Sequence, residues 1–304
     1  MKRVLLIVVA LLPALLFAQL VGERNEIAPG QKEFTGTRAN GDIIWSLDVE
    51  TITQDYQCVG AEFDGTFLWI SGGNSGSDPN KLYKIDPYTA TLVNTYEVPS
   101  QVAGWGLRDL AWIGDDGLLY GGWENGFLSF DPVTETFNEL FTGQSFGTIR
   151  ALAWDGSYFW TKSFSAALVQ FDISGTLQSS YPAPEAASAY GAACDWHEGY
   201  LYIFDQSNAV FLQYMLDGTY TGLNYDVSSF PGTEVAGGAF YDYGELVPGK
   251  ATLCGLIQGT PDTVIAVELY NSSTPEDIPL SPWAIGLAIV LIAGLVVGRM
   301  VIRR

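Results

Sequence analysis

Short apolar runs alternate with glycine-containing turns over most of the chain, and the alternation repeats. The clearest copy reads Ala151-Leu-Ala-Trp-Asp-Gly156, then Ser157-Tyr-Phe-Trp160, then Leu168-Val-Gln-Phe-Asp172. In each copy a small apolar strand ends at an aromatic residue, turns, and enters an aromatic-rich strand. A third strand ends on aspartate, and a fourth strand of alternating pattern completes the unit. The pattern therefore predicts a four-stranded antiparallel repeat.

The spacing of the repeats predicts a β-propeller. The closing aspartates Asp86, Asp131, Asp172 and Asp217 recur at intervals of 45, 41 and 45 residues, the period of four-stranded propeller blades. Residues 42–270 show no sustained helical period, so we expect an all-β fold. A two-sheet sandwich is the alternative, and it would make the repeat accidental.

The number of blades follows from the two ends of the repeat region. The last repeat offers three strands, at residues 236–241, 251–257 and 263–270, and no fourth. Residues 40–49 have the turn and alternation of a fourth strand. If this N-terminal strand pairs with the last three, the ring closes with no open sheet edge. We therefore expect a five-bladed propeller at residues 42–270.

The remaining segments predict export and anchoring. Residues 1–18 have the basic start and apolar run of a signal peptide, and residues 19–41 form an extended lead-in. A polar stalk at 271–281 precedes an apolar stretch at 282–302, which is long enough to span a bilayer as a helix. Basic residues at the C-terminus favour a cytoplasmic end. The predicted location is a bacterial cell surface, with the membrane as a partner through the C-terminal helix.

Two resemblances accompany these predictions. The tail, Ile278-Pro-Leu-Ser-Pro-Trp283 followed by an apolar span and Arg303-Arg304, resembles the C-terminal sorting tails of bacterial surface proteins. The repeats, with Trp154-Asp-Gly-Ser-Tyr-Phe-Trp160 as the best copy, are similar to those of secreted bacterial propellers of the glutamine cyclotransferase and quinoprotein-like groups. This second resemblance implies the blade scaffold, and no site residue is carried over from it.

Charge and composition exclude several functions. Residues 19–281 hold 9 Lys/Arg against all 34 Asp/Glu, a net charge of −25, which repels nucleic acid. Cys58, Cys194 and Cys254 each fall in an apolar strand, so we expect buried core residues. His197 is the only histidine, which argues against zinc sites and a Ser-His-Asp triad. We expect no cofactor.

Candidate ligand-binding residues are the polar residues that interrupt the inner strands and two aromatic residues outside the common repeat positions. If the former project into the channel, they form a ring of alternating charge; otherwise the arginines pair with neighbouring carboxylates. The two aromatics are expected to be exposed. The candidates are Glu62, Arg108, Asp109, Arg150, Asp195, Trp105 and Trp123. In the longest polar loop, Asn74, Asp78 and Asn80 are weak calcium candidates, since their spacing does not match a calcium loop and a plain hairpin explains them.

These observations favour a membrane-anchored surface propeller that binds a protein or a glycan. The alternative is an extracytoplasmic enzyme, a lyase, hydrolase or cyclotransferase, that uses channel carboxylates such as Glu62 and Asp195. A second alternative is a structural envelope protein. No recognisable catalytic constellation is present, so we identify no catalytic residue.

Overall fold

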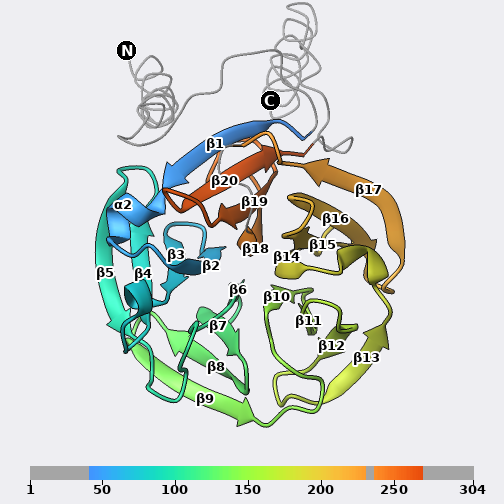
Figure 1. Cartoon of the computed structure of the whole chain (residues 1–304), viewed down its shortest axis with the longest axis horizontal. Helices are drawn as coiled ribbons and strands as arrows, with labels where there is room; N and C mark the ends of the chain where they lie inside the picture. Colours follow the sequence, from blue (N-terminus) through green and yellow to red (C-terminus); the bar gives the residue numbers. More distant parts are fainter. Residues whose placement is uncertain (1–40, 231–235, 270–304) are drawn as a thin grey trace, which may run out of the picture. The chain divides into compact units, whose positions relative to one another are not determined.

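The computed structural model describes residues 41–230 and 236–269, which form five four-stranded antiparallel sheets around a common axis (Figure 1). The five-bladed propeller predicted from the repeats is confirmed, and the sandwich is excluded. The predicted signal peptide, the lead-in up to residue 40, the stalk and the apolar span at 282–302 lie outside the described residues. Within the described part of the chain, no helix is long and apolar enough to cross a membrane.

Four blades are continuous in sequence. The first contains β2 (Cys58–Phe63), β3 (Leu68–Gly72), β4 (Lys81–Asp86) and β5 (Thr91–Glu97). The second contains β6 (Leu110–Ile113), β7 (Leu118–Trp123), β8 (Gly126–Asp131) and β9 (Thr136–Thr142). The third contains β10 (Ala151–Trp154), β11 (Phe159–Lys162), β12 (Leu168–Phe171) and β13 (Leu177–Tyr181). The fourth contains β14 (Ala189–Asp195), β15 (Tyr200–Asp205), β16 (Val210–Met215) and β17 (Tyr220–Asp226).

The fifth blade joins the two ends of the ring. It consists of β18 (Ala236–Asp242), β19 (Thr252–Ile257), β20 (Thr263–Glu268) and β1 (Ile43–Asp48), in the order β18-β19-β20-β1. β1 pairs antiparallel with β20, with Ser46 opposite Ile265. The predicted exchange of an N-terminal strand into the last blade is thus present, and it covers the outer edge of β20.

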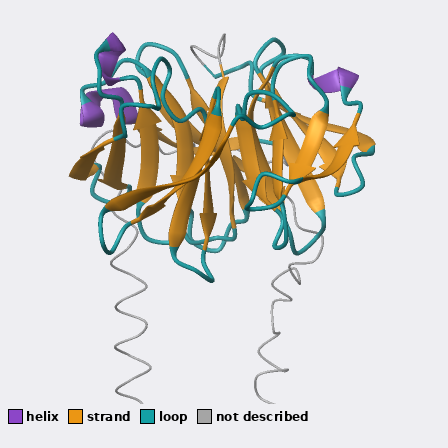
Figure 2. Cartoon of the chain, turned by 90° about the horizontal axis from the view of Figure 1, so that it is seen from below, coloured by secondary structure: helices purple, strands orange, loops and turns teal. Residues whose placement is uncertain are grey.

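The first strand of each blade lies nearest the axis and the fourth lies at the rim (Figure 1). The burial pattern agrees, since every residue of β14 is buried whereas β5 is almost wholly exposed. Three short helices, α2 (Val49–Thr53), η2 (Asn74–Gly76) and η3 (Pro184–Ala186), lie at one face of the ring (Figure 2). We call this the helix face. The inner strands also begin there. At the opposite face, the hairpin face, the inner strands end and turn into the second strands.

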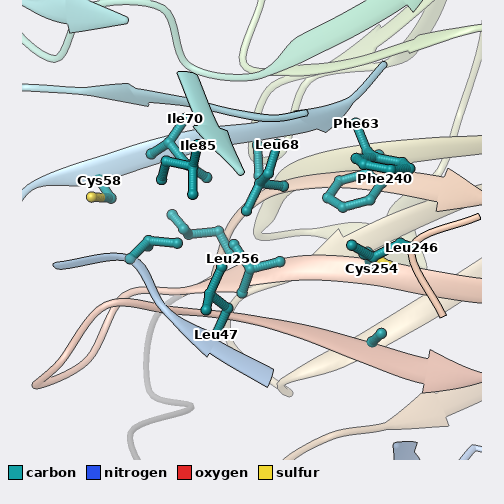
Figure 3. Close-up of a cluster of buried hydrophobic side chains, with 14 of the residues drawn as sticks. Leu47, Cys58, Phe63, Leu68, Ile70, Ile85, Phe240, Leu246, Cys254 and Leu256 are labelled. Atoms are coloured by element: carbon teal, nitrogen blue, oxygen red, sulfur yellow. The ribbon is translucent and has the colours of Figure 1, made fainter. Parts of the chain in front are cut away.

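The core consists of apolar clusters packed between neighbouring sheets. In the cluster between the fifth and first blades, Leu47 of β1 lies beside Leu256 of β19 (Figure 3). Phe63 and Phe240, from the two inner strands, have ring centroids 6.5 Å apart. All three cysteines are buried and unpaired, as expected from their apolar strands.

The Asp-Gly turns of the repeat have a structural role. In the third blade, Asp155 Oδ1 accepts the backbone N–H groups of Ser157 and Tyr158, and Oδ2 accepts the indole N–H of Trp160 at 2.6 Å. One carboxylate therefore closes the turn and also fixes a buried tryptophan of the second strand. The equivalent pairs are Asp64 with Trp69, at 2.7 Å, and Asp116 with the Tyr120 hydroxyl, at 2.6 Å.

Candidate functional site

The channel is closed near its middle by Asp109, which has no exposed surface. Its carboxylate accepts backbone N–H groups from the inner strands of four blades, donated by Leu110, Leu152, Ala192 and Ala239. Burial raises the pKa of Asp109, and the donated N–H groups oppose that rise. We call Asp109 a hub, because its hydrogen bonds link the inner strands of four blades. It is not an accessible ligand site.

Glycine allows the strands to come this close to Asp109. A Cβ added to Gly238 of β18 would overlap Asp109 Oδ1, and one added to Gly60 of β2 would lie 3.0 Å from the Asp109 Cα. The inner strands of all five blades therefore meet at this residue. Because Asp109 fills the meeting point, the two mouths of the channel are separate sites.

A pocket of about 420 Å³ occupies the mouth on the hairpin face. Its volume lies within the range of small-molecule sites. It is lined by the ends of all five inner strands and the turns that follow them. Among the described residues, its lining includes five acidic residues and no Lys, Arg or His; the acidic residues are Glu62, Asp64, Asp115, Asp242 and Glu245. The pocket is therefore a site of negative potential.

Glu62 is the carboxylate best placed for chemistry. It is partly buried, and its two oxygens accept the backbone N–H groups of Phe63 and Trp112 at 2.8 and 3.0 Å. Burial raises its pKa to about 8, although the two N–H groups act in the other direction. At neutral pH Glu62 is thus mostly protonated and poised to change charge.

Two other carboxylates of the pocket are occupied by the fold. Asp64 holds its turn and Trp69, as described above. Asp242 accepts the backbone N–H groups of Gly244, Glu245 and Leu246. Asp115 and Glu245 are exposed at the rim, so they are the pocket carboxylates most available to a ligand.

Aromatic side chains form much of the remaining wall. Trp196 and Tyr243 are 51% and 45% exposed, and their rings pack at 73° with centroids 6.3 Å apart. His197 packs against both rings, with centroid distances of 3.7 Å to Trp196 and 4.9 Å to Tyr243. Trp112 and Trp154 also line the pocket. Carboxylates beside exposed aromatic faces make a site suited to an organic cation.

The residues predicted from the sequence fall into three places. Glu62 lies in the hairpin-face pocket. Asp195, buried nearby but not in the lining, accepts the Tyr243 hydroxyl at 3.2 Å and the Glu198 N–H. Arg108 and Arg150, which precede β6 and β10, lie on the helix face, with Trp105 near Arg108. The hypothesis of one ring of alternating charge is therefore wrong, because Asp109 and the converging strands separate the two charge types.

Two further expectations are corrected. Trp123 is only 4% exposed and belongs to the core between the first and second blades; its place at the end of β7 turns it inward. The pairing of both arginines with carboxylates holds for Arg108 alone, whose Nη2 lies 3.3 Å from Glu124 Oε1. Within residues 41–230 and 236–269, no carboxylate lies within 4.0 Å of Arg150.

The polar loop at 72–80 is built around an aspartate that the sequence did not single out. Asp55 accepts the backbone N–H groups of Asn74 and Ser75, both at 2.7 Å, and the Tyr83 hydroxyl at 3.0 Å. The Asn80 side chain is buried and donates to the Val102 carbonyl. In the described part of the chain, no group of three or more His, Cys, Asp or Glu could hold a metal ion.

Sequence reasoning also missed Trp196 and Tyr243 as residues of the pocket wall. Trp196 occupies the aromatic position that ends each first strand, where Phe63 and Phe240 are buried and Trp112 and Trp154 are partly buried. Tyr243 follows β18 in an irregular turn that no repeat copy shares. The only available signal was the aromatic cluster in Trp196-His-Glu and Tyr241-Asp-Tyr, beside the two strand ends.

Comparisons with known proteins bear on the fold. No family model matches the chain, and no curated protein matches it. A solved structure with similar architecture is the glutaminyl cyclase of Myxococcus xanthus, with a TM-score of 0.53 and 14% sequence identity, covering 79% of this chain and 97% of that one. A nidogen/laminin complex matches with a TM-score of 0.46 and 11% identity, over 70% of this chain and 76% of that one. At such identities the likeness shows the propeller fold alone.

Proposed function

We propose that this protein is a surface-displayed propeller that binds a ligand carrying a cationic group in the hairpin-face pocket. The observation that carries the proposal is the pocket lining, in which the described residues include five acidic residues and exposed aromatic rings but no cationic side chain. An ammonium or guanidinium group gains there from both charge attraction and ring contact. The side chain of a lysine or arginine on a partner protein has this chemistry.

The binding proposal is tested with small organic cations. Tetramethylammonium and N-acetyl-lysine-methylamide are titrated into the full chain in detergent by calorimetry, with N-acetyl-glutamine-methylamide as the uncharged control. Trp196→Ala and Glu245→Gln should each weaken cation binding about tenfold, which corresponds to about 1.4 kcal/mol. Glu139→Gln, an exposed position on β9, removes the same charge away from the pocket and should change nothing. Equal binding of charged and uncharged probes would defeat the proposal.

A second candidate function is catalysis at the same pocket. The observation that favours it is Glu62, a carboxyl with its pKa raised to about 8 at the floor of the pocket. Such a group can give up or accept a proton near neutral pH. Cyclisation of an N-terminal glutamine is one reaction that needs such a transfer, since its amine loses a proton and ammonia leaves.

Turnover separates the two functions. The chain is incubated with a peptide bearing N-terminal glutamine, and mass spectrometry follows loss of ammonia against a buffer blank. Loss above the blank that is abolished in Glu62→Gln would favour the enzyme. Binding of cations without any turnover would favour the binding module.

We also propose that the propeller is held at the outside of a bacterial membrane by residues 282–302. The supporting observations are the apolar run and the basic C-terminus in the sequence. Deletion of residues 279–304 should release the protein into the medium, detected by immunoblot of culture fractions. Retention in the envelope after deletion would contradict the anchor.

A further inference from the structure

The helix face carries a second site that the proposed function does not use. Arg108 and Arg150 precede neighbouring inner strands and are only 4% and 8% exposed. Burial, and then the nearby charge of Arg108, lower the pKa of Arg150. Their one carboxylate partner among the described residues is Glu124, on Arg108, and its side chain is 72% exposed. Of the two buried cations, Arg108 is therefore paired with one exposed carboxylate, and Arg150 has no carboxylate partner among the described residues.

The guanidinium of Arg150 is held by rings instead of charge. Its central carbon lies 3.9 Å from the ring centroid of Phe164 and 5.2 Å from that of Tyr190. Its polar contacts among the described residues are the Ser163 hydroxyl, 3.4 Å from Nε, and Tyr190. Stacking occupies the face of a guanidinium and leaves its edge N–H groups to acceptors. An oxyanion at that edge would satisfy them.

The chain fixes Phe164 in this place through a buried lysine. Phe164 has a φ of 40°, a backbone conformation that is costly for a bulky residue. The ammonium of Lys162, on a side chain 1% exposed, donates to the carbonyl oxygens of Phe164 and Ala166 at 2.8 and 2.6 Å. Residues in such sparsely populated backbone conformations cluster at functional sites.

Exposed aromatic surface surrounds the two arginines. Trp105 is 47% exposed and Phe164 42%, and the Trp105 ring centroid lies 5.7 Å from the Arg108 guanidinium carbon. Flat rings beside guanidinium forks fit a ligand with a planar carboxylate attached to a ring that can stack. The acidic remainder of the protein repels long polyanions, so the ligand should offer one carboxylate.

We infer that Arg108, Arg150, Trp105, Phe164 and Tyr190 form a site for a single uronic acid unit at the end of a glycan. The two guanidinium groups bind the carboxylate, and the aromatic rings stack on the sugar. We call this set the arginine mouth. It lies on the opposite side of Asp109 from the acidic pocket, so it does not depend on the function proposed for that pocket.

The probe is glucuronate, titrated into the full chain in detergent and followed by calorimetry and by tryptophan fluorescence. Glucose tests the need for the carboxylate, and sulfate tests a general anion site. Arg150→Gln and Phe164→Ala should each weaken glucuronate binding about tenfold or more. Lys84→Gln, which removes a cation that lies over Phe67 on the first blade, is the matched control. Glu62→Gln should leave glucuronate binding unchanged.

Several outcomes would overturn the inference. Absence of glucuronate binding, or equal binding of glucose, would refute the role of the carboxylate. Tighter binding of N-acetylphenylalanine than of glucuronate, lost in Arg150→Gln, would assign the site to a peptide C-terminus instead. Arg150→Lys guards against misfolding, since it keeps the charge and removes the fork. It should fold as the wild type does and still lose about fivefold or more in affinity.

Discussion

At the scale of single residues, Asp109 links more blades than its place before one short strand suggests. This fully buried acidic side chain, just before β6, accepts backbone N–H groups from four different sheets. Removal of its carboxylate leaves those donors buried without a partner. A substitution at Asp109 should therefore affect all the blades that this residue links.

The first prediction follows from this hub. Asp109→Ala should lower the free energy of unfolding by at least about 3 kcal/mol, because each unsatisfied buried donor costs about 1–3 kcal/mol. Urea unfolding followed by tryptophan fluorescence measures the loss. The control is Asp217→Ala, an exposed turn residue, which should cost less than about 1 kcal/mol. Equal losses in the two variants would show that Asp109 is not a hub.

The second prediction concerns pH. Folding raises the pKa of Glu62 from 4.5 to about 8, so the folded chain binds this proton more tightly than the unfolded chain does. The contribution is complete below pH 4.5 and is lost as pH rises through 8. Glu62→Gln should therefore gain stability relative to the wild type between pH 5 and pH 9. Urea unfolding at both values gives the difference, and a gap that is constant with pH would contradict the raised pKa.

How far the site follows from sequence also differs residue by residue. Glu62, Arg108, Asp109 and Arg150 could be selected as candidates from the sequence, because an ionisable side chain within or beside an apolar strand needs a partner. The sequence did not show which mouth each faces, since that depends on how five strands converge at Gly60 and Gly238. The contact between Phe164 and Arg150 could not be seen in the sequence, because it depends on the positive φ of Phe164 and on the buried Lys162.

At the scale of elements, the Asp-Gly hairpin between first and second strands is the repeated device. The turn aspartate accepts turn N–H groups and an indole or phenol of the second strand. Sequence predicted the strands and turns well, because alternation and turn chemistry are local properties. The sequence did not predict the hydrogen bond between the Trp160 indole and Asp155, because that bond depends on how the second strand places the indole beside the turn.

The third prediction tests that bond. Asp155→Ala should lower the free energy of unfolding by about 2–3 kcal/mol, since it removes the hydrogen-bond acceptor of the Trp160 indole and of two backbone N–H groups. Chemical denaturation gives the loss. In a double-mutant cycle with Trp160→Phe, the two losses should couple by at least about 0.5 kcal/mol. Additive losses would mean that the aspartate acts on the turn alone.

At the scale of the whole molecule, closure of the ring rests on β1. Leu47 of this strand is fully buried between the fifth and first blades. The sequence predicted the closure because the last repeat lacks a strand that the N-terminal segment can supply. The likeness to a glutaminyl cyclase structure supports the architecture over 79% of the chain.

The fourth prediction compares two leucines in rim strands. Leu47→Ala should lower the free energy of unfolding by about 2–5 kcal/mol, the usual cost of a cavity in a core. Leu92→Ala, on β5 at 41% exposure, should cost less than about 1 kcal/mol. Both are measured by urea denaturation. A single cooperative transition in Leu47→Ala would show that the ring unfolds as one unit, whereas an early partial transition would show that the fifth blade detaches first.

The exchanged strand also makes the order of the blades cyclic. Ile43 lies opposite Val267 on paired strands, so the polypeptide enters and leaves the ring at one edge of one blade. A circular permutant that links residue 269 to residue 41 and opens between β9 and β10 would keep every sheet. The fold therefore does not require the chain ends to lie in one particular loop. In a permutant, the loop that carries the new ends would determine which mouth of the propeller faces an attached anchor.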